Sequence, residues 1–312
     1  QSIAAERDKI TNLFGMQFPW VQGKLTVTVG ETQEKDIPCR IRYDGDFTYM
    51  LAGPSPKRPM FVELLEGRSF DGVTAFQLHT MQFDPTLMRE RIAAHVFASI
   101  GATVTRTAHA ELSYVVGEKD ARYVGLFTLL EAVDSSLLKR NKIPESSLLL
   151  QTNGLNSIQY SGDQWTAYAP LFRSATAPNR KQQQRIIAFA KLIDQATNDE
   201  FDQQIGDYID TEAVLRYVAA NSLTSNLTGF SSIGVNDYLC LDDNGRFHML
   251  ARELETALGG AIMSGTPEQL ANLRLFRPYA GECPLIDRLM NSSSTKDAYA
   301  KIVRDALQLS YA

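Results

Sequence analysis

The stretch NLTGFSSIGVNDYLCLDDNGRFHMLARELETALGG, residues 226–260, determines how the rest of the chain is interpreted. Two β-prone runs, residues 238–241 and 247–250, flank an Asp-Asn-Gly sequence at 243–245. Asn and Gly tolerate the positive φ angles of a tight turn, so the pattern predicts that the two runs pair as a β-hairpin.

This predicted hairpin brings polar side chains together at its open end. Asn236 comes just before the first run, and Glu253 and Glu255 come just after the second. One amide and two carboxylates provide the oxygen ligands that Mg²⁺ prefers in proteins. We therefore expect Asn236, Glu253 and Glu255 to form a magnesium site.

The order of these features is similar to the catalytic region of protein kinases. There a proton-accepting Asp is followed by a metal-binding Asn, a short hairpin and a metal-binding Asp. Here the loop that begins at Asn226 has Thr228 in place of the proton-accepting Asp, and Glu253 and Glu255 stand where Asp is expected. The stretch thus indicates a kinase-like scaffold whose catalytic positions, Asn226 and Thr228, are altered.

Composition limits the class of protein. The chain has 312 residues, of which 44% are hydrophobic, enough for one large domain or two coupled lobes. Its net charge is −5 without a long cluster of Lys and Arg, which argues against a nucleic-acid groove or an anionic membrane patch. No apolar run is long enough to span a bilayer. The three cysteines are odd in number and lack metal-type spacing, which disfavours a zinc site and a disulfide framework.

Strand-like and helix-like patterns divide the chain near its middle. Alternating or β-prone runs occupy residues 25–29, 37–41, 60–65, 111–116 and 123–130. After about residue 145 the apolar spacing becomes mostly helical. The prediction is an α+β fold with a strand-rich N-lobe, residues 1–145, that carries one long helix, and a mostly helical C-lobe, residues 146–312.

The long helix of the N-lobe has clear start and stop signals. Asp84 is the predicted N-cap, Pro85 lies in the first turn, and Gly101 supplies the C-terminal stop. Its apolar spacing is set by Met88, Ile92, Val96 and Ile100.

Charged residues near this helix are candidates for phosphate binding. Lys57 and Arg58 enter a predicted strand, and Arg89 and Glu90 lie in the first turns of the helix. In a kinase-like lobe a helix Glu pairs with a strand Lys to orient the nucleotide, so Glu90 with Lys57 or Arg58 is the expected pair. The alternative is that Glu90 only complements the positive helix N-terminus, and that the two bases face solvent.

Residues 125–134, GLFTLLEAVD, have the shape of a kinase interlobe hinge. A buried strand leads to Glu131, and a polar segment then begins a helix. Such a hinge binds an adenine ring through its backbone, here that of Glu131, Ala132 and Val133.

With these features together, the sequence resembles the CotH family, the spore-coat protein H kinases, which have an atypical kinase fold. The resemblance rests on residues 76–90, which look like the family's Asp-Pro-Ser…Arg-Glu helix, on 101–107, on the hinge-like 125–134 and on 236–260. The last segment is similar to the family's Asn-Tyr-Tyr-Leu-Tyr hairpin and Pro-Trp-Asp-Leu-Asp metal motif. The resemblance implies a bilobal fold, binding of ATP and Mg²⁺, and a secreted or spore-surface location.

The sequence departs from the family pattern at the chemical positions. The family's Asn-x-Asp loop is Asn226-Leu227-Thr228 here, and its Trp-Asp-Leu-Asp is residues 252–255, Arg-Glu-Leu-Glu. Phe61 and Gln151 stand where the family usually has Lys.

Two functions therefore stay open. One is an ATP- and Mg²⁺-dependent phosphotransferase with a degenerate centre and weak or altered activity on a protein acceptor. The other is a pseudokinase, a protein-binding or structural module without turnover. Arg252 supports the second, because a guanidinium beside two carboxylates can replace the metal cation. The sequence alone leaves open whether the protein is an enzyme.

Overall fold

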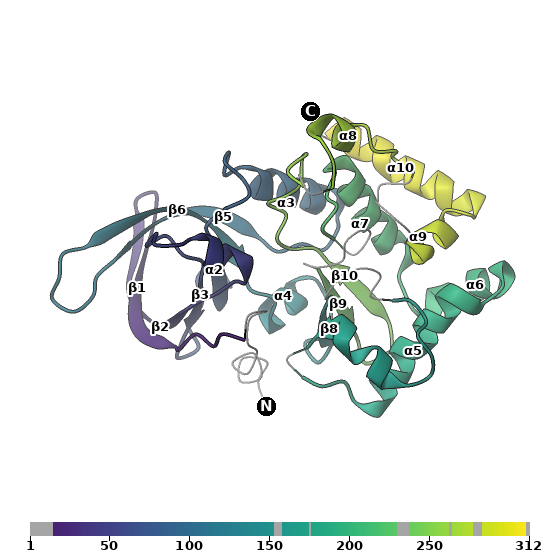
Figure 1. Cartoon of the computed structure of the whole chain (residues 1–312), viewed down its shortest axis with the longest axis horizontal. Coiled ribbons are helices and arrows are strands. Elements are labelled where there is room, and N and C mark those ends of the chain that lie inside the picture. Colours follow the sequence, from purple (N-terminus) through teal and green to yellow (C-terminus); the bar gives the residue numbers. More distant parts are fainter. Residues whose placement is uncertain are drawn as a thin grey trace. The chain divides into compact units, whose positions relative to one another are not determined.

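The computed structural model describes residues 15–152, 158–174, 176–229, 237–261, 264–276 and 283–309. The fold is mixed α and β, and the contacts divide it into two compact units. Unit 1 is Gln1–Leu87 with Thr105–Lys142, and unit 2 is Met88–Val104 with Ile143–Ala312. Most of the helices and strands are labelled in Figure 1.

Unit 1 is built on a six-stranded antiparallel sheet with the order β1-β2-β3-β4-β6-β5. Its strands are β1 (Val21–Val29), β2 (Thr32–Tyr43), β3 (Met60–Leu64), β4 (Ala75–His79), β5 (Thr107–Tyr114) and β6 (Arg122–Glu131). Two short helices accompany the sheet, α2 (Phe47–Leu51) and α4 (Ser135–Arg140). The strands predicted from alternation are therefore present with shifted bounds: β1, β2 and β6 are longer than predicted, β3 ends one residue earlier, and β5 begins and ends earlier.

The core of unit 1 follows from the alternation of side chains along the strands. In β2, Ile37 and Cys39 are buried while their neighbours are partly exposed. Cys39 lies opposite Leu64 of β3 in the ladder, and Leu64 is also buried. Phe127 of β6 completes the same apolar cluster.

Unit 2 contains most of the helices and a four-stranded antiparallel sheet with the order β10-β9-β7-β8. The strands are β7 (Leu148–Thr152), β8 (Phe172–Arg173), β9 (Tyr238–Leu241) and β10 (Phe247–Leu250). The α-helices are α3 (Arg89–Ile100), α5 (Arg180–Gln195), α6 (Asn198–Gln204), α7 (Thr211–Leu223), α8 (Pro267–Ala271), α9 (Pro284–Leu289) and α10 (Ser293–Leu309). The 3₁₀ helices are η1 (Trp165–Ala167), η2 (Ala169–Leu171) and η3 (Ile205–Asp207).

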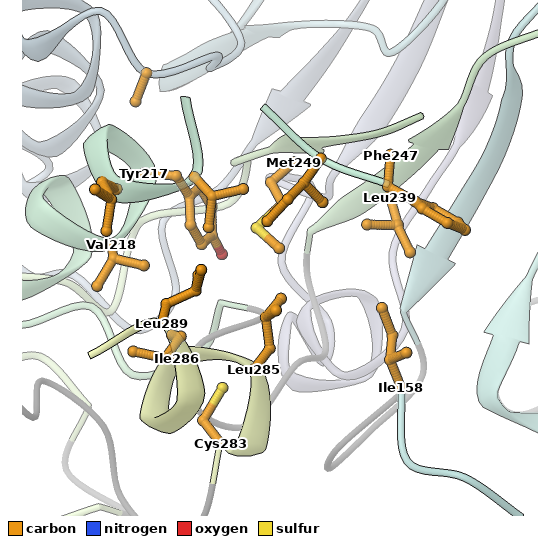
Figure 2. Packing of buried hydrophobic residues seen from close by; sticks show 14 of the residues in the cluster. Ile158, Tyr217, Val218, Leu239, Phe247, Met249, Cys283, Leu285, Ile286 and Leu289 are labelled. Carbon is orange, nitrogen blue, oxygen red and sulfur yellow. The ribbon is translucent and has the colours of Figure 1, made fainter. Parts of the chain in front are cut away.

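The core of unit 2 gathers side chains from α7, the β9–β10 hairpin and α9. Figure 2 shows Tyr217 and Val218 of α7 with Leu285, Ile286 and Leu289 of α9 in one apolar cluster, which also takes in Met249 of β10. These residues are nearly inaccessible to solvent. This packing fixes α7, the helix that leads into the predicted catalytic loop.

Helix α3 belongs to unit 2, which differs from the prediction that it lies in the N-terminal lobe. It packs on α7 and α10, and the ring of Phe97 meets that of Tyr217 edge-on with centroids 6.1 Å apart. At its C-terminal end Arg216 donates to the carbonyl of Ile100 at 2.7 Å. The Ala251 backbone N–H also donates to the Thr103 carbonyl at 3.0 Å, which ties the segment after α3 to the end of β10.

The predicted start of α3 at Asp84 is wrong. Asp84 is buried and its carboxylate accepts from the backbone N–H and the hydroxyl of Thr86, so it closes a separate turn. Leu87 has φ of 58°, which a right-handed helix cannot accommodate, and the helix begins only at Arg89. The stop at Gly101 is confirmed, with φ of 80°.

The buried face of α3 also differs from the predicted one. Met88 and Ile92 are exposed, at 45% and 43%. Ile100 is buried as predicted and Val96 is partly buried against the core, and the other buried residues of the helix are Glu90, Ala93, Ala94 and Phe97.

Candidate functional site

The loop after α7 is held by the side chain of Asn226, which is fully buried. Its Nδ2 donates to Oδ1 of Asn221 at 2.8 Å, and its Oδ1 accepts from Oγ1 of Thr228 at 2.9 Å. The Thr228 backbone N–H lies 3.4 Å from the same oxygen. Thr228 thus presents a hydroxyl that is hydrogen-bonded to the Asn226 amide. In the sequence comparison with kinases, a carboxylate is expected at this position.

This loop lies against the acidic segment that follows β10. Oγ1 of Thr256 is 3.4 Å from Oγ1 of Thr228, and the Leu258 backbone N–H donates to the Thr224 carbonyl at 2.6 Å. Residues that are far apart in sequence therefore meet, and the structure brings Thr228 beside the segment of Glu253 and Glu255.

The hairpin between these two parts is confirmed as predicted. β9 and β10 pair antiparallel, with Leu241 opposite Phe247 and Tyr238 opposite Leu250. Gly245 has φ of 83° and donates to the Asp242 carbonyl at 3.0 Å. Asp242 is buried, which opposes its ionisation, but hydrogen bonds from the Arg246 backbone and from His248 lower the net pKa of its carboxyl.

Arg252 is the charged centre of the segment after the hairpin. Its guanidinium donates to the carboxylate of Glu253, although Arg252 is only 6% exposed. The guanidinium carbon also lies 5.6 Å from the centre of the Tyr238 ring. The carboxylate that was predicted to bind Mg²⁺ therefore has an internal cation as its partner.

The magnesium prediction stays a prediction. Asn236 lies outside the described residues, while Glu253 and Glu255 lie in the segment beside Thr228. In the part of the chain that the structure describes, no three His, Cys, Asp or Glu side chains are grouped so that they could hold a metal ion.

Glu90 on α3 faces the same acidic segment from another element. Its side chain is fully buried, and among the described residues only the Leu254 backbone N–H lies close enough to act on its carboxylate as a donor, without the geometry of a good hydrogen bond. Burial raises the pKa of Glu90 well above its usual value of 4.5, and the negative charges of Glu255 and Glu253 raise it further. Arg252 and the nearby Leu254 backbone N–H act in the opposite direction.

Glu90 is buried in the first turn of α3, where a carboxylate also complements the helix N-terminus, so the alternative interpretation stays open. Its expected partners, Lys57 and Arg58, belong to unit 1, so the pair remains a prediction. Arg89, the first residue of α3, lies beside Gly260, which follows the segment of Glu253 and Glu255 in the chain. A Cβ on Gly260 would lie 3.1 Å from Cδ of Arg89.

Asp237 was not singled out from the sequence. It directly precedes β9 and is 1% exposed, and its Oδ2 accepts a hydrogen bond from the hydroxyl of Tyr217. An acidic residue at the start of a predicted strand is commonly a surface residue, so nothing in the local pattern marked it as buried. The available signal was its place beside Asn236, where the resembled family has Tyr.

A sequence model described as CotH kinase protein matches residues 41–310. The chain belongs to this family. The CotH resemblance inferred from residues 76–90, 125–134 and 236–260 is thereby confirmed, since all three segments fall within the matched range.

Two curated relatives in the CotH family show how distant the similarity is. Inner spore coat protein H from Bacillus subtilis (strain 168) is 20% identical over 257 residues, which covers 81% of this chain and 67% of that protein. Invasin CotH7 from Rhizopus delemar is 23% identical over 260 residues, covering 78% of this chain. The aligned part is only 41% of the invasin's own length.

The basic residues of unit 1 have partly structural roles in this CotH family member. The Arg58 guanidinium donates to the carbonyls of Tyr49 and Gly53 and lies over the Tyr49 ring, so it closes its own loop. Nζ of Lys57 lies 5.4 Å from the centre of the Phe127 ring, and partial burial lowers the pKa of this amine. No described carboxylate forms an ion pair with Lys57, which keeps it the better candidate for a phosphate.

The predicted hinge residues are also engaged within unit 1. The backbone N–H groups of Glu131 and Ala132 donate to the carbonyls of Arg106 and Ala75 at 2.9 and 3.0 Å. The Glu131 carboxylate accepts from Arg106 and Arg140. The backbone N–H groups of Glu131 and Ala132 are thus already used within unit 1, and adenine binding by this segment stays a prediction.

A separate hollow lies away from these residues. It has a volume of about 500 Å³ and is formed by the end of α3, the start of α7 and α10. None of the predicted site residues is among the described residues that line it. In the same described part of the chain, no helix has the length and apolar character to cross a membrane.

Proposed function

We propose that the chain is an ATP- and Mg²⁺-dependent phosphotransferase scaffold of bilobal, kinase-like type, with a degenerate centre and weak or altered activity. The observation that carries the proposal is the meeting of the Asn226–Thr228 loop with the segment of Glu253 and Glu255, joined through Thr228 and Thr256. In phosphoryl transfer, most of the rate comes from positioning and electrostatics, so the absence of a proton-accepting Asp lowers activity without abolishing it.

The proposed roles follow the predicted residues. Asn236, Glu253 and Glu255 would hold Mg²⁺, which neutralises charge on the transferred phosphoryl group. Lys57, Arg58 and Arg89 would bind phosphate oxygens, and the backbone of residues 131–133 would bind adenine. Each Glu is one methylene longer than Asp, and Mg²⁺ tolerates displaced ligands poorly, which again favours weak activity.

The second candidate is a pseudokinase that binds a protein partner without turnover. The partly buried ion pair between Arg252 and Glu253 favours it, because the guanidinium occupies a carboxylate that the metal would need. The relatives are named a spore coat protein and an invasin. By analogy we propose a secreted or spore- or cell-surface location for this chain.

Thermal unfolding with ATP and Mg²⁺ tests the proposal. A ligand at about a hundred times its dissociation constant stabilises the folded state by roughly 2.7 kcal/mol, which is visible as a shift in Tm. The shift should require Mg²⁺ and should disappear in Glu253→Gln and Glu255→Gln. The control is Glu145→Gln, an exposed Glu of the same unit, which should keep the shift.

Each result selects between the candidates. A Mg²⁺-dependent shift that is lost in both variants supports the phosphotransferase scaffold and justifies an assay of ADP release. No shift at millimolar ATP contradicts it and favours the partner-binding pseudokinase.

A further inference from the structure

Asp237 is held by three elements of unit 2. Its Oδ2 accepts from the Tyr217 hydroxyl on α7, and its Oδ1 lies 3.4 Å from the Arg252 backbone N–H. Its own carbonyl accepts from the backbone N–H of Thr152 on β7 at 3.1 Å. The position of this buried carboxylate is therefore fixed by α7, β7 and the segment after β10.

The same carboxylate touches the loop that carries Thr228. A Cβ on Gly229 would lie 2.7 Å from Oδ2 of Asp237 and 2.7 Å from the Tyr217 hydroxyl. It would also lie 2.9 Å from Oδ1 of Asn221. Only a residue without a side chain fits here, so the loop is seated directly on these three polar groups.

The other end of the loop is anchored to the same turns of α7. Asn221 Nδ2 donates to the Tyr217 carbonyl at 2.9 Å, and Asn221 Oδ1 accepts from Asn226, which in turn accepts from Thr228. Tyr217 and Asn221, one helical turn apart, thus hold both ends of residues 226–229. Asp237 fixes the hydroxyl of Tyr217 in this arrangement.

We propose that Asp237 and Tyr217 are positioning residues that hold the loop of residues 226–229, and with it the Thr228 hydroxyl, in the geometry needed for transfer. This inference rests on the phosphotransferase function proposed above, because it assigns a purpose to the same loop. Neither side chain contacts the reacting groups in this proposal. They act through Gly229 and Asn221, and a displacement of about 1 Å in such a loop can cost about 100-fold in rate.

Two measurements on Asp237→Ala, Tyr217→Phe and the double variant test the proposal. The first is hydrogen exchange of the backbone amides of Thr228 and Gly229, which needs no activity. Exchange at these amides should rise at least about tenfold in each variant, with little change in β7. The second is ADP release from ATP with water as the acceptor, for which kcat should fall about 10- to 100-fold while KM for ATP is unchanged.

The pattern among the variants separates positioning from general destabilisation. Because either single variant already breaks the hydrogen bond between the two side chains, the double variant should be no worse than the poorer single variant. Asp237→Asn should restore near-normal exchange and kcat, because the Asn oxygen can still accept from Tyr217. Asp199→Ala, an exposed acid on α6, is the control and should change neither quantity.

Unchanged exchange in the loop overturns the proposal, as does an additive double variant. The proposal is also overturned if Asp237→Asn raises loop exchange and lowers kcat as much as Asp237→Ala does. The charge of Asp237, rather than its hydrogen bond, would then matter. If the variants show the expected rise in exchange but even the wild-type protein releases no ADP, the loop-holding role stands. That result contradicts the phosphotransferase function instead.

Discussion

The guanidinium of Arg252 donates a hydrogen bond to the carboxylate of Glu253, the next residue in the chain. Arg252 itself is only 6% exposed. Glu253 has φ of 55°, a left-handed conformation that turns the backbone at this point. Arg252 also counteracts the raised pKa of Glu90. Arg252 therefore acts as a counter-charge both to Glu90 on α3 and to Glu253 in the segment after β10.

Replacing this cation should destabilise the protein strongly. In Arg252→Met, Glu253 and its acidic neighbours lose their buried counter-charge, and removal of one partner of a buried pair costs about 3–5 kcal/mol. Chemical denaturation at neutral pH measures the loss, and added Mg²⁺ should recover part of it if the carboxylates can bind a metal. Arg304→Met, at an exposed position on α10, is the matched control. A stability equal to that of the wild type would show that Arg252 is not the counter-charge.

Glu90→Gln should stabilise the protein at neutral pH and not at acidic pH. Burial raises the pKa of Glu90 in the folded state, so the folded protein binds its proton more tightly than the unfolded chain does. Wild-type stability should therefore fall as the pH rises from about 4.5, the usual value, to the raised folded value. Glu90→Gln should be more stable than the wild type by on the order of 1 kcal/mol or more at pH values above this range, and equally stable at pH values below it.

Denaturation of both proteins from pH 4 to pH 8 measures this difference. A gain that is independent of pH would mean that the amide packs better than the carboxyl, and that ionisation of Glu90 is not the cause.

Gly229→Ala should destabilise the protein by about 1–3 kcal/mol, because the new methyl group collides with buried polar atoms that cannot easily move. Those atoms belong to Asp237, Tyr217 and Asn221, all at most 1% exposed. Gly206→Ala is the control, since a Cβ there meets nothing within 4 Å. The thermal midpoints of the two variants give the comparison, and equal midpoints would contradict the close contact at Gly229.

Glu131→Gln should destabilise unit 1 by about 1–2 kcal/mol. The change weakens charge-assisted hydrogen bonds from Arg106 and Arg140, whose side chains are each 36% exposed and therefore partly screened by water. Glu111→Gln, an exposed Glu on β5, should have no effect. If Glu131→Gln instead leaves stability intact and weakens ATP-dependent stabilisation, the carboxylate has a role in the hinge rather than in the ion-pair network.

The parts of the fold that local chemistry controls could be predicted. The β9–β10 hairpin has the predicted strands because Asn244 and Gly245 suit its turn and the flanking runs are β-prone. Gly101 ends α3 for a similarly local reason, its left-handed conformation. In both cases a few neighbouring residues determine the backbone.

The start of α3 could not be predicted because two local structures share one sequence signal. Asp followed by Pro and Thr is typical of a helix N-terminus, but the same side chain can close a turn on its own. Asp84 does the latter, and Leu87 then takes a positive φ. The buried face of α3 follows the shape of unit 2 rather than apolar spacing, which is why Glu90 is buried while Met88 is not.

The sequence predicted which segments meet at the candidate site, but not which side chains contact one another there. The hairpin pattern placed Glu253 and Glu255 near Asn236, and the structure joins their segment to the loop of Thr228 through Thr256. The partners of buried polar groups depend on tertiary packing, so the sequence did not predict the contact between Asp237 and Tyr217. Asn236 remains a prediction because it lies outside the described residues.

The membership of α3 in unit 2 has a consequence for biosynthesis. The helix leaves the ribosome long before α7, against which Phe97 packs, has been made. Until then its apolar face, with Ala93, Ala94 and Phe97, has no partner from α7, and chain closure over such a separation is slow. A nascent chain stalled between unit 1 and α7 should therefore be the species most prone to aggregate and most dependent on chaperones.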